Sequence, residues 1–131
     1  MIDWGQVVWK LRIKLPHTEW VRVMEVKFET TFLQLHEAIQ EAVEFDNDHL
    51  FEFYVGKNPR SRAYAVGGEP NWDTFNPAKV YNKVRLSSVW PLPTGYKLYY
   101  IFDFGDNWLF QINKTRNKDK LLQPGVSFPG S

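Results

Sequence analysis

The first part of the chain alternates between apolar and polar positions, which is the period of a β-strand. In the stretch QVVWKLRIKL every second residue is apolar and shares one face, namely Val7, Trp9, Leu11, Ile13 and Leu15. A turn at Pro16 follows, and WVRVMEVKF continues the alternation, with Arg22 on an otherwise apolar face. We therefore expect two neighbouring strands, each with one buried face.

A helical period replaces this alternation after the second strand. Thr31 and Gln34 have the spacing of a capping box, which places the start of a helix near Phe32. Apolar positions then recur at steps of three and four, with His36 among them, and glutamates lie on the opposite side. The pattern predicts an amphipathic helix of about three turns.

Strand patterns return further along the chain. HLFEFYVG predicts a strand whose inner face includes His49. YKLYYIFDFGDNWLFQIN predicts a β-hairpin, because Gly105, Asp106 and Asn107 are residue types that tolerate a positive φ at a turn.

The segments around these strands have a weaker pattern. Residues 57–79 contain three prolines and a pair of glycines without a clear period, which predicts a long loop. Residues 79–90 predict a short strand and a single helical turn, and the turn-rich residues 114–131 predict a coil-like tail.

The order of these elements is β-β-α-β, a long loop, a short element and a β-hairpin. Because turns rather than repeated helical crossovers join the strands, we expect a mostly antiparallel sheet. One main amphipathic helix packs on one face of it. The fold class is α+β, and residues 1–131 form a single domain.

Composition narrows the class of protein. The 131 residues include 17% aromatic residues, no cysteine and a net charge of +1. This composition suits a folded core, excludes disulfides and cysteine-based chemistry, and offers no bulk charge to attract nucleic acid or membrane. No apolar run reaches the ~20 residues of a membrane span, and the N-terminus lacks a secretory signal pattern. We expect a cytoplasmic protein.

Three polar side chains fall on faces that are otherwise apolar: Arg22, His36 and His49. Burying such groups without partners costs about 2 kcal/mol or more, so we expect carboxylate partners. Asp48, Asp103 and Asp106 are the natural candidates, because they lie at strand or hairpin ends. We favour a network that only holds the elements together. The alternative is a pocket lined by His36, His49 and Asp103, for a small ligand or, as a weaker candidate, a metal.

Four stretches together carry a family resemblance: WVRV, LQLHEAIQEAVEFDNDHLFEF, VRLSSV and YKLYYIFDFGDNW. From Val7 to Asn113 the chain resembles the plasmid pRiA4b ORF-3-like family, which combines a Leu-His helix, a His-Leu strand and an Asp-Phe-Gly-Asp-x-Trp hairpin. The resemblance implies an α+β fold and a plasmid or mobile-element setting, because the family includes passenger proteins of insertion sequences. It implies no defined activity. Trp108 is the hairpin tryptophan, and Phe110 stands where the family usually has histidine.

Three functional interpretations remain open. We favour a non-enzymatic binding or interaction module without a cofactor, whose partner is a protein or a small molecule. The second is a small metal-dependent or hydrolytic enzyme centred on His36, His49 and Asp103. The third is a nucleic-acid accessory protein of a mobile element, which the resemblance alone suggests and the net charge does not support. The candidate ligand-binding residues are Arg22, His36, His49, Asp103, Asp106 and Trp108.

Overall fold

The structure, a computed structural model, describes residues 7–27, 29–45, 50–103, 107–115 and 120–121. The elements follow in the order β1 (Val7–Lys14), β2 (Val21–Lys27), α1 (Phe32–Val43), β3 (Phe51–Gly56), β4 (Arg62–Ala65), α2 (Pro77–Tyr81), the 3₁₀ turn η2 (Leu86–Ser88), β5 (Lys97–Phe102), β6 (Trp108–Lys114) and β7 (Lys120–Leu121).

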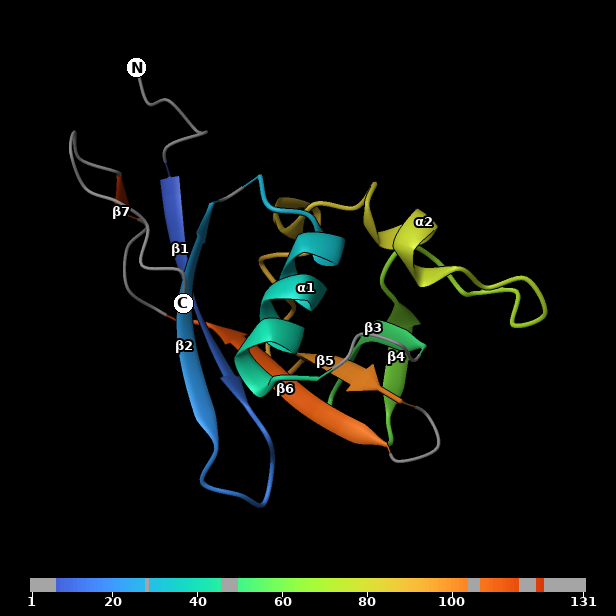
Figure 1. The fold of residues 1–131 in the computed structure, drawn as a ribbon, viewed down its shortest axis with the longest axis horizontal. Coiled ribbons are helices and arrows are strands. Elements are labelled where there is room, and N and C mark those ends of the chain that lie inside the picture. The colour runs from blue at the N-terminus through green and yellow to red at the C-terminus, as the bar shows by residue number, and fades with distance from the viewer. Residues whose placement is uncertain (1–6, 28, 46–49, 104–106, 116–119, 122–131) are drawn as a thin grey trace.

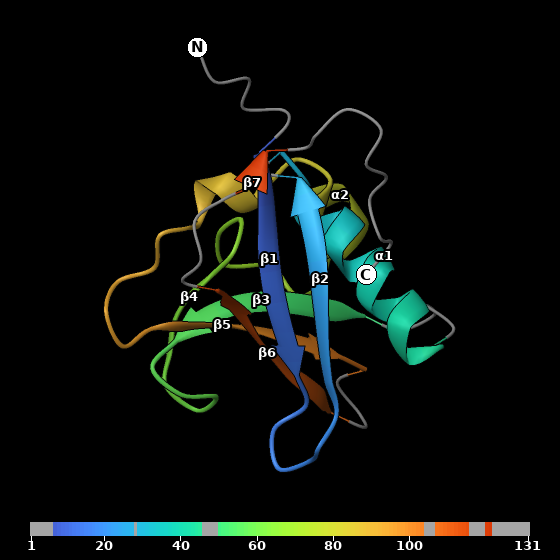
Figure 2. The same cartoon turned by 90° about the vertical axis from the view of Figure 1, so that its left-hand side faces the viewer.

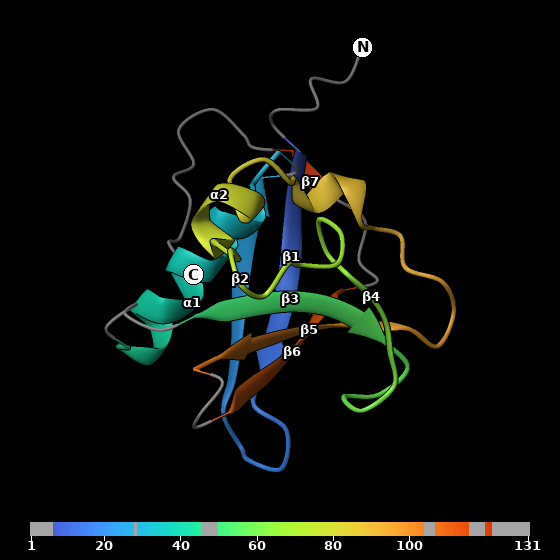
Figure 3. The same ribbon diagram turned by 90° about the vertical axis from the view of Figure 1, so that its right-hand side faces the viewer.

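The strands of the described region form one sheet in the order β2-β1-β6-β5-β3-β4, with β7 paired to β1. Every pairing is antiparallel, so the prediction of an α+β fold with an antiparallel sheet is confirmed. The sheet twists strongly, and β1 and β2 run steeply across the direction of β3 (Figure 2). Helix α1 covers one face of this curved sheet, and α2 lies near the first turns of α1 (Figures 1 and 3).

Helix α1 begins where the capping box predicts. The Thr31 hydroxyl accepts a hydrogen bond from the Gln34 amide at 3.2 Å, and the Gln34 side chain accepts one from the Thr31 amide at 2.9 Å. The helix ends at Val43, and Glu44 follows in the left-handed conformation with φ 59°. The buried stripe of α1 consists of Phe32, Leu35, His36, Ile39 and Gln40.

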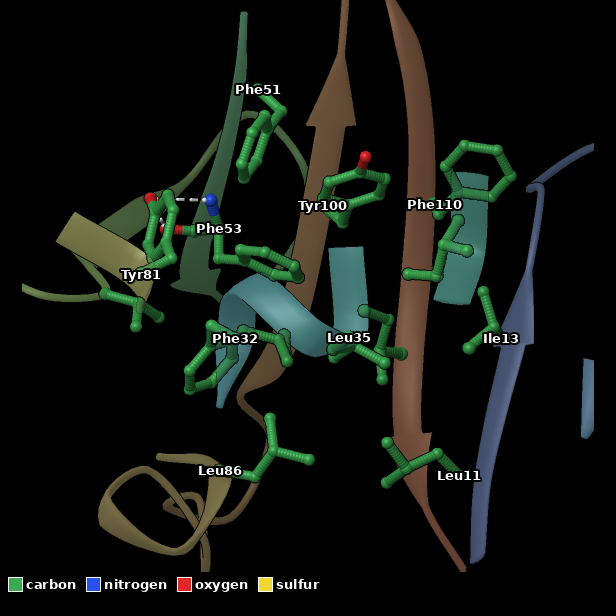
Figure 4. Packing of buried hydrophobic residues seen from close by; sticks show 14 of the residues in the cluster. Leu11, Ile13, Phe32, Leu35, Phe51, Phe53, Tyr81, Leu86, Tyr100 and Phe110 are labelled. Carbon is green, nitrogen blue, oxygen red and sulfur yellow. Dashed lines mark hydrogen bonds between the residues drawn. The ribbon is translucent and has the colours of Figure 1, made fainter. Parts of the chain in front are cut away.

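The core between α1 and the sheet is rich in aromatic side chains. The Phe53 ring lies 4.9 Å from that of Phe32 and 4.8 Å from that of Tyr100, measured between centroids. Tyr81 of α2 lies at one end of this core, where its hydroxyl accepts a hydrogen bond from the Phe53 amide at 2.9 Å (Figure 4). The hydroxyl thereby satisfies a backbone donor of β3 beside the end of β4.

The loop region differs from the expectation. Residues 57–79 contain β4 and the start of α2. Residues 79–90 contain the end of α2 and η2, so helical structure is present as predicted, but the predicted strand is replaced by a single bridge between Thr31 and Arg85. Asn76 caps α2, since its side chain accepts a hydrogen bond from the Lys79 amide at 3.3 Å, and Pro77 is the first helical residue. An Asn-Pro pair is a helix-start signal that the interpretation of residues 57–79 as a loop overlooked.

In the predicted tail, 114–131, the structure describes residues 114 and 115 and strand β7. A strand there differs from the predicted coil, because Lys120 and Leu121 pair through their backbones with the start of β1. Within the described residues no helix has both the length and the apolar character that crossing a membrane requires.

Candidate functional site

His36 lies inside the core, between α1 and the sheet. Its side chain is 1% exposed, its ring stacks on Phe51 with 3.5 Å between centroids, and its Nδ1 atom lies 2.6 Å from the Tyr100 hydroxyl oxygen. Gln40, one turn further along α1, donates to the same hydroxyl at 3.0 Å. The prediction that His36 points inward is therefore correct, and the contacts tie α1 to β5.

The other predicted site residues are distributed over several elements. Arg22 is half-buried on β2, and β1 and β6 separate β2 from β5 in the sheet. Asp103 follows β5 with φ 59°, is half-buried, and its amide donates to the Leu50 carbonyl at 2.9 Å. Trp108 is 39% exposed at the start of β6.

Two of the predicted site residues, His49 and Asp106, lie outside the described residues, and so does the predicted carboxylate partner Asp48. Among those that the structure does describe, no group of three or more histidine, cysteine, aspartate or glutamate side chains is arranged to hold a metal ion. The weak metal hypothesis requires His49, so it stays a prediction, as does the grouping of the polar side chains into one pocket.

A different cluster of charged and aromatic side chains lies on the face of the sheet that α1 does not cover. Phe51, Phe53 and Val55 of β3 point into the core, so Glu52 and Tyr54 point to the opposite face. Both are nevertheless buried, with exposed fractions of 1% and 4%. Something on the outer face must therefore cover them.

The cover is the turn between β3 and β4, together with Arg62. Together with the segment before α2 and the β5–β6 hairpin, they surround a hollow of about 390 Å³, which we call the outer-face pocket. Its polar and aromatic lining consists of Glu52, Tyr54, Arg60, Arg62, Trp72 and Asn107. Pro59, Ile101 and Leu109 complete the lining.

Arg62 and Glu52 form a bidentate ion pair at the pocket. Arg62 Nη1 donates to Glu52 Oε1 at 2.8 Å, and Nη2 donates to Oε2 at 2.5 Å. The guanidinium carbon lies 4.5 Å from the centroid of the Tyr54 ring, in the position of a cation–π contact. The hydrogen bonds to Glu52 raise the pKa of the Arg62 guanidinium above its ordinary value, so the charge is permanent.

Tyr54 connects the pocket to the β3–β4 turn. Its hydroxyl donates to the Pro59 carbonyl at 3.0 Å, and its ring lies 5.4 Å from that of Tyr99. Asn58 tightens the same turn, because its side-chain oxygen accepts from the Arg60 amide at 3.0 Å. These two hydrogen bonds fix the backbone that carries Arg60. Burial raises the pKa of Tyr54, so its phenol stays neutral.

Trp72 comes from the segment between β4 and α2. Its side chain is 53% exposed, yet its ring lies 5.3 Å from that of Phe75, whose ring in turn lies 6.4 Å from the buried ring of Tyr81. These contacts connect the exposed indole to the aromatic core. A large aromatic surface exposed beside a hollow is a common feature of binding sites.

Sequence reasoning missed the outer-face pocket. It identified polar residues on apolar strand faces, but Glu52 lies on a strand that is buried on both sides, and Arg62 lay in the predicted loop. The available signal was a single acidic residue inside the run FEFYV, followed by Arg60 and Arg62 within the next ten residues. A buried acid of this kind requires a cationic partner.

Comparisons with known proteins agree with the fold. A model of the plasmid pRiA4b ORF-3-like protein family matches residues 7–124. The uncharacterized protein y4hQ of Sinorhizobium fredii (strain NBRC 101917 / NGR234) is 33% identical over 110 residues, which are 82% of this chain and 53% of y4hQ, so the chain spans about half the length of this curated relative.

A solved structure is also similar. The crystal structure of the protein of unknown function MM3350 from Methanosarcina mazei Go1 superposes with a TM-score of 0.66 at 26% sequence identity. The match covers 94% of this chain and 66% of MM3350. The family model, the sequence relative and the shared fold lead to one conclusion. This chain belongs to the plasmid pRiA4b ORF-3-like protein family.

Proposed function

We propose that the protein is a non-enzymatic binding module whose ligand site is the outer-face pocket. One observation carries this proposal: a buried carboxylate holds an arginine rigidly at a hollow that an exposed tryptophan also lines. Ordered cationic and aromatic groups of this type contribute strongly to binding, because little side-chain entropy remains to be lost when a ligand arrives.

The chemistry of the lining favours binding over catalysis. Both oxygens of Glu52 accept hydrogen bonds from Arg62, so this carboxylate is poorly placed to take a proton from a substrate. The Tyr54 phenol is neutral and donates to a backbone carbonyl. Among the described residues that line the pocket there is no histidine, serine, threonine or lysine. The lining thus supplies groups for recognition rather than a nucleophile with its base.

A fragment screen by protein-observed NMR tests the proposal. The library contains small anionic, neutral and cationic aromatic compounds, and the indole N–H signal of Trp72 and the amide signals of Arg60 and Asn107 report binding. We expect at least one compound to shift these signals in a saturable manner, and Trp72→Leu to weaken that compound. Tyr64→Leu is the matched control, because Tyr64 is 42% exposed on β4 and does not line the pocket.

Two results would overturn this proposal. One is a screen in which no compound of any charge shifts the signals of the pocket. The other is binding confined to the hollow beside Trp108, which α1 and the β1–β2 turn also line and which has a volume of about 400 Å³. Equal weakening by Trp72→Leu and Tyr64→Leu would count against the pocket as well, because only Trp72 lines it.

A further inference from the structure

We infer that the outer-face pocket recognises an anionic group, a carboxylate or a phosphate, attached to a flat ring. This inference rests on the proposed function and names the chemical class of its ligand. It follows from three properties of the lining: its accessible charge, the donors of Arg62 that Glu52 does not use, and the exposed aromatic surface of Trp72.

The accessible charge of the pocket is positive. The lining contains one carboxylate, on Glu52, and two guanidinium groups, on Arg60 and Arg62. Glu52 is 1% exposed and both of its oxygens are occupied by Arg62. The Arg62 side chain is 37% exposed, and Arg60 is exposed, so a ligand meets the guanidinium groups rather than the carboxylate.

Arg62 keeps donors for a second anion. A guanidinium has five N–H bonds in a planar fork, and Glu52 accepts one from each Nη atom. The Nε–H and one remaining Nη–H lie along one edge, and this spacing matches two oxygens of a carboxylate or a phosphate. Glu69 also contributes to raising the pKa of Arg62, but the described hydrogen bonds of the guanidinium are those to Glu52.

The flat ring is inferred from the aromatic side chains. The guanidinium of Arg62 already lies over the Tyr54 ring, so Tyr54 is not the platform. Trp72, with 53% of its surface exposed, presents the large aromatic surface of the lining. Stacking on an indole favours planar rings, whatever substituents they carry. A hollow of about 390 Å³ has the size of a small-molecule site.

Four probes of similar size test the class of ligand. Phenyl phosphate and benzoate carry the two anions, while benzyl alcohol is neutral and benzylamine is cationic at neutral pH. We expect phenyl phosphate or benzoate to bind at least about tenfold more tightly than the other two, the difference that a charge-assisted hydrogen bond typically makes. Inorganic phosphate, which lacks the ring, should bind more weakly than phenyl phosphate. The ratio of phenyl phosphate to benzoate affinity distinguishes the two anions.

Arg60→Gln is the main variant, because Arg60 is exposed and its removal leaves the buried ion pair in place. It should weaken the anionic probes several-fold and leave benzyl alcohol unchanged. Arg85→Gln is the matched control, since it removes one exposed arginine that does not line the pocket. Arg62→Lys keeps the charge but loses the fork, and it should reduce the preference for anions if its folded spectrum is retained.

The two levels of the proposal fail in different ways. If benzyl alcohol or benzylamine shifts the pocket signals as strongly as the anions, the inference about charge is overturned and the binding module stands. Equal loss of anion binding in Arg60→Gln and Arg85→Gln would also overturn it, because it would indicate a nonspecific charge effect. If neither these probes nor any fragment of the library acts at the pocket, both fail.

Discussion

At the residue scale, Tyr100 connects the sheet to α1 through its hydroxyl group. The hydroxyl lies 2.6 Å from His36 Nδ1 and accepts from Gln40 at 3.0 Å, and all three side chains are nearly completely buried. A buried polar group that loses its partner keeps the cost of its desolvation. The contribution of Tyr100 therefore depends on two residues that are far away in sequence.

Tyr100→Phe should lower the free energy of unfolding by about 1–3 kcal/mol, because it leaves His36 and Gln40 without this contact. Denaturant unfolding followed by circular dichroism measures the effect. Tyr64→Phe is the control, because Tyr64 is 42% exposed and should change stability by less than about 0.5 kcal/mol. Equal stability of both variants would contradict a structural role for the Tyr100 hydroxyl.

A second prediction at this scale concerns the Glu52–Arg62 pair: replacing Arg62 should cost more stability than replacing Glu52. Glu52 is 1% exposed, whereas the Arg62 side chain is 37% exposed and reaches water. Arg62→Met leaves a buried carboxylate without its partner, so it should cost about 2 kcal/mol or more. Glu52→Gln should cost less, because the guanidinium that remains can be hydrated.

A double-mutant cycle measures this asymmetry. The variant Glu52→Gln with Arg62→Met should be more stable than Arg62→Met alone, since no buried charge remains. If Arg62→Met is the milder single change, Glu52 is not held as the structure describes.

At the element scale, the parts of the fold with local signals were predictable. The capping box at Thr31 placed α1, and period-two alternation placed β1, β2, β3 and the β5–β6 hairpin. Strand β4 and the start of helix α2 were missed, because each element is short and its stability comes from contacts with distant residues such as Phe53. Short elements of this kind carry too few residues for a period to emerge.

The candidate site, like the fold, could be predicted from the sequence only in part. The inward direction of His36 was predictable from the helical stripe, and burial at 1% agrees with it. The outer-face pocket was not predictable, because its lining comes from β3, the β3–β4 turn, the segment before α2, and the hairpin. Which side chains meet there depends on the sheet order, and alternation along one strand does not contain that order.

Thr31→Ala tests the local signal at the start of α1. The substitution removes the side-chain acceptor for the Gln34 amide, so we expect a loss of about 1 kcal/mol in unfolding free energy. Thr74→Ala is the control, because Thr74 is an exposed loop residue outside the helices. A null effect of Thr31→Ala in thermal and chemical unfolding would mean that tertiary contacts alone determine where the helix begins.

Gly56→Ala tests the turn that carries Arg60. A Cβ atom at Gly56 would collide with the Ser61 backbone carbonyl, so the β3–β4 turn must shift. We expect both lower stability and weaker binding of the anionic probes at the outer-face pocket. Gly95→Ala is the contrast: its added Cβ meets no atom within 4 Å and its cost is the positive φ of 85°, about 1 kcal/mol. Unchanged probe binding in Gly56→Ala would show that the conformation of the β3–β4 turn does not determine binding at the pocket.

At the scale of the whole molecule, both faces of the sheet bury tyrosine side chains. Burial raises the pKa of several of them above the ordinary value, namely Tyr54, Tyr81, Tyr99 and Tyr100. Tyr81 and Tyr100 lie on the helix side, and Tyr54 and Tyr99 lie on the outer face beside the pocket. The stability contributed by the helix-side core and the stability contributed by the outer face therefore depend on pH in the same direction.

The sign of that dependence follows from the direction of the shifts. In the unfolded chain a tyrosine loses its proton at about pH 10, whereas in the folded protein burial holds the pKa of these phenols above that value. The unfolded state is therefore favoured as the pH rises above about 10, by up to about 1.4 kcal/mol per pH unit for each buried tyrosine. Below that pH the stability from these groups is fully present.

Denaturant unfolding at a series of alkaline pH values measures the slope, and tyrosinate absorbance of the folded protein shows whether the phenols stay neutral. Tyr100→Phe should make the slope shallower by the share of one tyrosine, because burial raises the pKa of Tyr100. Because Tyr99 and Tyr54 lie on the outer face, binding of an anionic probe at the pocket should be retained until the molecule unfolds as a whole. A flat stability profile, or ionisation of Tyr100 at the ordinary tyrosine pKa in a protein that is still folded, would contradict the buried position of its phenol.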